Sequence, residues 1–231
     1  MKRLKYIVIP IVFFTLIELC LRYLGFGDPV LYMHSENNYY PKSNQQNIRY
    51  KGARININQF GMRTNSDWSN YLDKKKIIFF GDSVTYGGSY IDNENLFSQK
   101  VCDNFLKNTI CGNYGVNGYS IKNIYLRIKK IDKRYYDQIV IVVSSEIENN
   151  LSKFSNFPFY EKFDYFLLKA SFEILNHFMF KYKIYDAFHE EEQNDLIDQQ
   201  NKSISLRKLL NSIANDKEVI IFILPTLEDI I

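Results

Sequence analysis

Short apolar runs alternate along this chain with segments whose apolar residues recur at helical spacing. Runs of four to eight apolar residues are too short for buried helices and predict strands covered on both faces. The strands predicted in this way are residues 77–80, 139–143 and 219–224, and a shorter strand is predicted over 109–111 before Gly112. The predicted helices are residues 94–107, 121–128 and 206–213. Strands that alternate with helices predict a parallel sheet wrapped on both faces.

The helix predicted over 94–107 has a polar residue, Asn93 or Asp92, that can cap its N-terminus. Residues 151–202 then interrupt the alternation with an insertion rich in aromatic and charged residues. Part of this insertion, residues 162–182, has a helical pattern. We interpret its aromatic side chains as the packing of a lid or flank rather than as a cofactor site.

The N-terminal residues 1–26 have a different pattern, in which basic residues precede an apolar run over 6–17. Including the flank that follows, the segment reaches the roughly 20 residues that a membrane-spanning helix needs. Glu18 and Arg22 are four residues apart and can pair on such a helix. No small-x-small cleavage site follows the run, which favours an uncleaved signal anchor over a cleavable signal peptide. The positive-inside rule then predicts that the chain after Gly27 lies outside the cytoplasm.

Residues 27–73 are polar and rich in turn residues, which predicts a stalk or a loose subdomain between the anchor and the domain over 74–231. Within this segment, residues 54–63 alternate apolar and polar positions and then turn at Gly61. This alternation predicts a short strand followed by a turn.

A serine follows the first predicted strand of the domain, in the sequence Gly-Asp-Ser-Val-Thr-Tyr-Gly over 81–87. Open α/β sheets place their ligands at the carboxyl ends of their strands, so the Ser83 side chain is expected at the sheet rim. A phosphate-binding loop is excluded on chemistry, because no Gly-Lys-Ser or Gly-Lys-Thr follows. The remaining alternative is a glycine-rich turn whose small residues only permit tight packing.

This block resembles the first motif of the SGNH (GDSL) hydrolases, a family of esterases and acyl-transfer enzymes, at Gly81, Asp82, Ser83, Thr85 and Gly87. The resemblance implies that Ser83 is the nucleophile, that its backbone N–H helps form an oxyanion hole, and that Asp82 supports the loop. Residues 109–120, a short strand followed by two glycines three apart, resemble the second block of the family, in which Gly118 matches the glycine whose N–H is an oxyanion donor. The Asn-x-x-Gly-Met-Arg sequence over 58–63 resembles a segment that precedes the serine block in membrane-anchored members.

The resemblance weakens after the strand predicted over 139–143. Glu146 stands where the family has an asparagine donor, and an ionised carboxylate can only accept hydrogen bonds. Either Asn149 or Asn150 takes this role through a shifted loop, or the hole has backbone donors alone. The family's catalytic Asp-x-x-His follows a fifth strand, whereas here Asp186 and His189 have that spacing before the fourth. The plainest interpretation is a shortened domain without its dyad, with Asp186 and His189 as an alternative.

Composition adds little to this interpretation. The 231 residues have a net charge of +3, which is too small to predict nucleic-acid binding. The three cysteines have no metal-ligand spacing. We expect Cys102 and Cys111 to be buried packing thiols, with a disulfide between them as an alternative in an oxidising compartment.

The resemblance therefore implies an α/β protein, a flavodoxin-like three-layer α/β/α sandwich of the SGNH type, behind one transmembrane helix. The implied activity is that of a serine esterase or acyl-transfer enzyme on acyl esters, with acetyl esters of envelope glycans or lipids as the implied substrates. No metal or organic cofactor is implied, and the implied location is the bacterial cytoplasmic membrane, with the main domain outside the cytoplasm. The alternative is an inactive or truncated envelope protein that keeps the fold for binding or has no remaining role.

Overall fold

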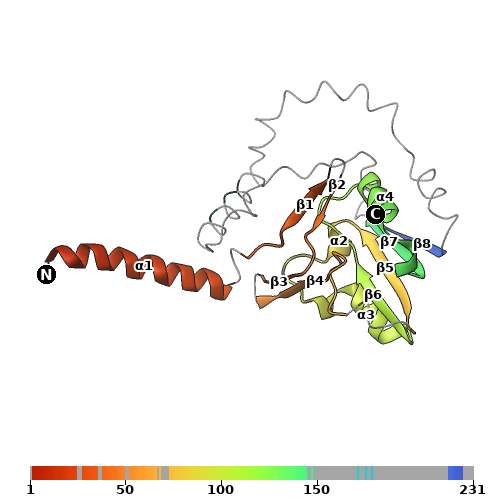
Figure 1. Ribbon diagram of the computed structural model, residues 1–231, viewed down its shortest axis with the longest axis horizontal. Coiled ribbons are helices and arrows are strands. Elements are labelled where there is room, and N and C mark those ends of the chain that lie inside the picture. Colours follow the sequence, from red (N-terminus) through yellow and green to blue (C-terminus); the bar gives the residue numbers. More distant parts are fainter. Residues whose placement is uncertain are drawn as a thin grey trace, which may run out of the picture.

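A parallel sheet of four strands is the centre of the protein (Figure 1). The computed structural model describes residues 2–24, 28–35, 38–49, 52–66, 68, 73–144, 147, 171, 175, 178 and 218–225. The strand order is β6-β5-β7-β8. The strands are β5 (Lys75–Gly81), β6 (Thr109–Asn113), β7 (Gln138–Ser144) and β8 (Glu218–Leu224). Every neighbouring pair is parallel, which confirms the predicted α/β class.

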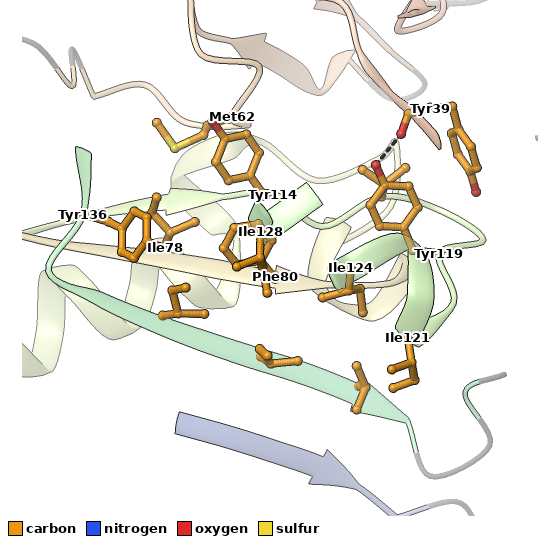
Figure 2. Packing of buried hydrophobic residues seen from close by; sticks show 14 of the residues in the cluster. Tyr39, Met62, Ile78, Phe80, Tyr114, Tyr119, Ile121, Ile124, Ile128 and Tyr136 are labelled. Carbon is orange, nitrogen blue, oxygen red and sulfur yellow. Dashed lines mark hydrogen bonds between the residues drawn. The ribbon is translucent and has the colours of Figure 1, made fainter. Parts of the chain in front are cut away.

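Helices lie on both faces of this sheet, because successive side chains of each strand point to opposite sides. Ile78 and Phe80 of β5 pack in one cluster with Ile124 of α4 (Ile121–Lys130), as Figure 2 shows. Ile77 and Phe79 pack in a second cluster with Cys102 of α3 (Phe97–Phe105). The alternating side chains of one strand therefore supply two separate cores.

The helices predicted over 94–107 and 121–128 are present as α3 and α4, with one correction at the start of α3. The helix predicted over 206–213 and most of the insertion over 151–202 lie outside the described residues. A 3-10 turn, η2 (Asn93–Asn95), precedes α3, and the N-cap of α3 is Leu96. Asp92 makes no capping bond, because its Oδ1 instead accepts the backbone N–H of Arg54 at 2.7 Å. A second 3-10 turn, η3 (Lys133–Tyr135), leads into β7.

Two antiparallel hairpins form in the segment that we expected to be a polar stalk or a loose subdomain. They are β1 (Tyr32–Ser35) with β2 (Asn38–Pro41), and β3 (Gln45–Ile48) with β4 (Arg54–Ile57). The strand predicted before Gly61 is therefore confirmed as β4. Apolar side chains after this strand enter the main core, because Met62 and Trp68 are fully buried beside Ile78. Where the N-terminal segment ends and the main domain begins stays a prediction.

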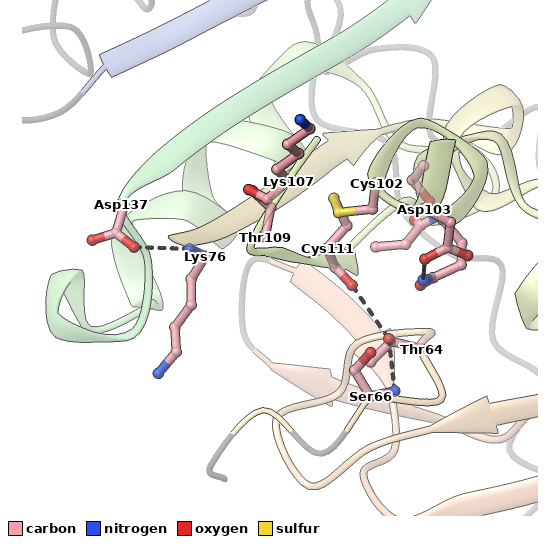
Figure 3. Close-up of a disulfide and its surroundings, with 12 residues drawn as sticks. Thr64, Ser66, Lys76, Cys102, Asp103, Lys107, Thr109, Cys111 and Asp137 are labelled. Atoms are coloured by element: carbon pink, nitrogen blue, oxygen red, sulfur yellow. Dashed lines mark hydrogen bonds between the residues drawn. A yellow bond between two sulfur atoms is a disulfide. The ribbon is translucent and has the colours of Figure 1, made fainter. Parts of the chain in front are cut away.

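Cys102 and Cys111 form a disulfide, which corrects our expectation of packing thiols (Figure 3). The packing of α3 on the neighbouring strand brings the two Cα atoms to 6.0 Å, which lies within the range that a disulfide bridges. Cys20 is a free, exposed cysteine.

The N-terminal helix α1 (Lys2–Leu24) projects away from the sheet in Figure 1. The predicted pairing on this helix is confirmed, since Arg22 Nη2 lies 2.8 Å from Glu18 Oε1. Apolar side chains are exposed all along α1, from Tyr6 to Leu24. Within the described part of the chain, no helix combines the length and apolar character needed to cross a membrane.

Candidate active site

Ser83 lies directly after β5, at the carboxyl edge of the parallel sheet. It is the first residue of α2 (Ser83–Tyr86), a single helical turn, and its side chain is exposed. This turn closes with Gly87 in the left-handed conformation at φ 85°, where its N–H donates to the Ser83 carbonyl. The hydroxyl of Ser83 therefore stands at the sheet rim where ligands of open α/β sheets bind.

Gly81 brings this turn against the sheet, because no side chain fits at its position. A Cβ on Gly81 would lie 1.9 Å from Thr85 Oγ1 and 2.1 Å from the carbonyl oxygen of Val142. Those two atoms are themselves hydrogen-bonded, since the Thr85 hydroxyl donates to the Val142 carbonyl at 2.9 Å. Thr85 thus anchors α2 to β7 through the space that the glycine leaves.

Asp82 is buried and caps α2. Its Oδ1 accepts the backbone N–H of Val84 at 2.9 Å, and its backbone carbonyl accepts the N–H of Tyr86. The carboxylate is therefore directed into the turn, where it supports the backbone around Ser83.

The loop after β6 packs directly on this turn. Asn113 Nδ2 donates to the Thr85 carbonyl at 2.7 Å, while Asn113 Oδ1 accepts the N–H of Gly115 at 2.8 Å. A Cβ on Gly115 would lie 2.3 Å from the backbone nitrogen of Tyr86. We did not identify Asn113, Thr85 and Gly115 as a bonded unit from the sequence, although all three lie in the two blocks that carry the family resemblance.

Gly118 follows in the same loop and is exposed. Its φ of +74° lies in the left-handed region that favours glycine, and a Cβ there would lie 3.1 Å from the Tyr39 hydroxyl. Tyr39 in turn donates to the Asn117 carbonyl at 2.9 Å, so β2 supports this part of the loop. Gly118 and Ser83 accordingly follow the carboxyl ends of neighbouring strands, β6 and β5.

The other residues predicted for the site, Asn149, Asp186 and His189, lie outside the described residues, as do Glu146 and Asn150. Their assigned roles stay predictions. No group of three or more His, Cys, Asp or Glu side chains that could hold a metal ion occurs in the described part of the chain.

Two buried ionisable groups lie behind the Ser83 turn. Burial raises the pKa of the Tyr86 hydroxyl, which is therefore neutral at physiological pH. Burial also lowers the pKa of Arg63, whose guanidinium lies 4.7 Å from the centre of the Tyr86 ring. This pair joins the back of the turn to the N-terminal segment.

Fold and site together define an α/β protein with an exposed serine at the carboxyl edge of a parallel sheet. No protein-family model matches the chain, and no curated protein matches its sequence. The resemblance to SGNH hydrolases accordingly rests on the residues of its motifs.

Proposed function

We propose that the protein is a serine esterase or acyl-transfer enzyme of the SGNH type. The observation that carries this proposal is the exposed Ser83 hydroxyl on a tight turn at the carboxyl end of β5. The strand order β6-β5-β7-β8, with α3 and α4 on opposite faces, supports a flavodoxin-like three-layer arrangement.

In this proposal the Ser83 oxygen attacks the carbonyl carbon of an acyl ester, and its proton passes to a base. His189, oriented by Asp186, is the proposed base, because a serine hydroxyl at neutral pH is a poor nucleophile without one. The backbone N–H groups of Ser83 and Gly118 stabilise the negative oxygen of the tetrahedral intermediate, with Asn149 as the third proposed donor. Collapse of the intermediate releases the alcohol and leaves an acyl-serine, which water or a second hydroxyl then cleaves.

The environment proposed for this activity is the bacterial cell envelope. The Cys102–Cys111 disulfide supports a location outside the cytoplasm, because disulfides persist in oxidising compartments. The exposed apolar surface of α1 and the Glu18–Arg22 ion pair support attachment to the cytoplasmic membrane through this helix. Alkaline carbonate should leave the full chain in the membrane pellet, and a variant without residues 2–24 should be released. Release of the full chain by carbonate would contradict an inserted helix.

Labelling with a fluorophosphonate tests the nucleophile, since this reagent forms a covalent bond with an activated serine. We expect the purified protein to be labelled, Ser83→Ala to abolish the label, and Ser66→Ala, a control outside the Ser83 turn and the loop that follows it, to keep it. A label that persists in Ser83→Ala would refute the assignment.

A second candidate, an inactive envelope protein, is favoured by one observation in the sequence. Glu146 occupies the position of the asparagine donor, and its carboxylate would repel an oxyanion. A folded protein that takes up no fluorophosphonate would support this second candidate.

A further inference from the structure

The Asn-x-x-Gly-Met-Arg sequence over 58–63 forms a compact turn next to the core. Asn58 Oδ1 accepts the backbone N–H groups of Phe60 and Met62, each at 3.0 Å. Gly61 has φ +75°, a left-handed conformation that favours glycine. The turn directs the Met62 side chain into the main core and thereby fixes the backbone position of the next residue, Arg63.

The backbone of Arg63 is held between the β3-β4 hairpin and the four-stranded sheet. It forms isolated antiparallel bridges with Ile57, at the end of β4, and with Asn113, at the end of β6. The Arg63 N–H donates to the Asn113 carbonyl at 2.8 Å. These bridges hold the Arg63 backbone in a fixed position beside the loop that packs on the Ser83 turn.

The guanidinium of Arg63 donates hydrogen bonds to several residues of the loop that follows α2. Nη1 donates to the carbonyls of Tyr86 at 2.7 Å and Gly88 at 2.6 Å, and Nη2 donates to the carbonyl of Ile91. Nε donates to Asn93 Oδ1 at 3.1 Å. Arg63 is only 2 % exposed, so these bonds form away from water. A planar guanidinium with five N–H donors suits such a set of converging oxygens, which a lysine ammonium cannot match.

The residues that Arg63 binds are connected to Ser83 through the backbone hydrogen bonds of α2. Gly87, between the two carbonyls that Nη1 binds, donates its N–H to the Ser83 carbonyl at 3.0 Å. Tyr86 likewise donates its N–H to the Asp82 carbonyl at 2.9 Å. A displacement of residues 86–88 would therefore be transmitted to the residue that carries the nucleophile.

We propose that Arg63 is a positioning residue for Ser83, and that the Asn58–Arg63 turn serves to place it. The catalytic part of this inference rests on the proposed function, in which Ser83 is the nucleophile. Arg63 itself is too deeply buried to contact a substrate, so its effect on the reaction passes through the loop over 86–93.

Arg127 offers a matched control, because it is also a buried arginine, at 7 % exposure. Its guanidinium lies 4.4 Å from the ring centre of Tyr40 and 4.6 Å from that of Tyr114, and Nη2 lies 3.5 Å from the Phe60 carbonyl. Two of these contacts, with Phe60 and Tyr114, touch the 58–63 turn and the loop after β6, but none of them reaches residues 82–93, the Ser83 turn and the loop that Arg63 binds. Arg127→Met should therefore destabilise the protein without moving the nucleophile.

The first test compares fluorophosphonate labelling rates per folded molecule, with the melting temperature of each variant measured alongside. We expect Arg63→Met to label about a hundredfold more slowly, since a misplacement of about 1 Å can cost that much. Arg63→Lys should recover part of the rate, and Arg127→Met should stay within about threefold of the wild type. Equal labelling rates in Arg63→Met and Arg127→Met would overturn the proposal, because a purely structural role predicts that outcome.

Amide hydrogen exchange gives a readout that does not depend on catalysis. Residues 84–93 should exchange faster in Arg63→Met but not in Arg127→Met, even if the wild type takes up no fluorophosphonate. An unlabelled wild type with this exchange pattern would refute the proposed function, but it would still support the role of Arg63 in holding the loop over 86–93. Unchanged exchange over 84–93 in Arg63→Met would refute the proposal that Arg63 holds this loop in place.

Discussion

Gly81→Ala tests directly whether the Ser83 turn is built on the absence of a side chain. The φ of Gly81 is not in the left-handed region, so alanine at this position adds a steric cost without backbone strain. The new Cβ would lie 1.9 Å from Thr85 Oγ1 and 2.1 Å from the Val142 carbonyl oxygen. Neither contact is tolerable, because both lie far inside van der Waals distance.

The cost can be estimated from what must move. Thr85 can escape only by breaking its 2.9 Å hydrogen bond to Val142, a loss of about 1 kcal/mol. The Val142 carbonyl belongs to the backbone of a strand paired on both sides, so relieving the second contact requires a shift of a strand. Such overpacking costs about 1–3 kcal/mol. The free energy of unfolding should therefore fall by about 2–4 kcal/mol, and the melting temperature by roughly 5–15 °C.

Urea unfolding followed by circular dichroism measures this loss. Gly52→Ala is the matched control, because Gly52 has φ +75° but no atom within 4 Å of the added Cβ. Its cost should be about 1 kcal/mol, from backbone strain alone. Thr85→Ala removes one of the two contacts, so the double variant with Gly81→Ala should lose less than the sum of the single losses. If Gly81→Ala costs no more than Gly52→Ala, the described packing of the turn is wrong.

Three further predictions concern the packing around the site. Burial raises the pKa of Tyr114 to about 12, so its contribution to stability is full below pH 10 and is lost as pH rises to about 12. Tyr114→Phe should remove about 3 kcal/mol of this alkaline loss, measured by urea unfolding from pH 8 to 12, and an unchanged pH profile would contradict the assignment. Replacing Cys102 and Cys111, nine residues apart, by serine should lower the free energy of unfolding by roughly 2–3 kcal/mol in the same assay. The Cβ of Gly115→Ala would lie 2.3 and 2.6 Å from backbone atoms, so this variant should destabilise the protein more than Gly118→Ala, whose cost is about 1 kcal/mol. The reverse order would contradict the described packing of this loop.

The secondary structure of the core was predictable because its signals are local. The apolar runs that became β5 and β7 have the length and composition of buried strands, and the spacing of Ile121, Ile124 and Ile128 matches one face of α4. The start of α3 was predicted less well. Asp92 has the chemistry of a cap, but tertiary packing brings the Arg54 N–H to its carboxylate instead.

The candidate site was predictable only in part. Ser83, Asp82 and Gly118 were identified because short motifs mark them, and their positions at the ends of β5 and β6 follow from the order of the elements. The bond from Asn113 to Thr85 and the side-chain bonds of Arg63 were not predictable, since these partners lie 20 or more residues away in the sequence. A polar side chain in a sequence carries no sign of which distant carbonyl it will bind.

By itself, the sequence determined the four strands of the parallel sheet and the helices α3 and α4, because hydrophobic periodicity acts over a few residues. It also determined that a serine follows the first strand of the sheet. Tertiary structure alone decided that Met62 joins the main core, that Cys102 and Cys111 pair, and that Arg63 holds the loop behind Ser83. These are contacts between segments far apart in the chain, and they form only when the packed sheet brings those segments together.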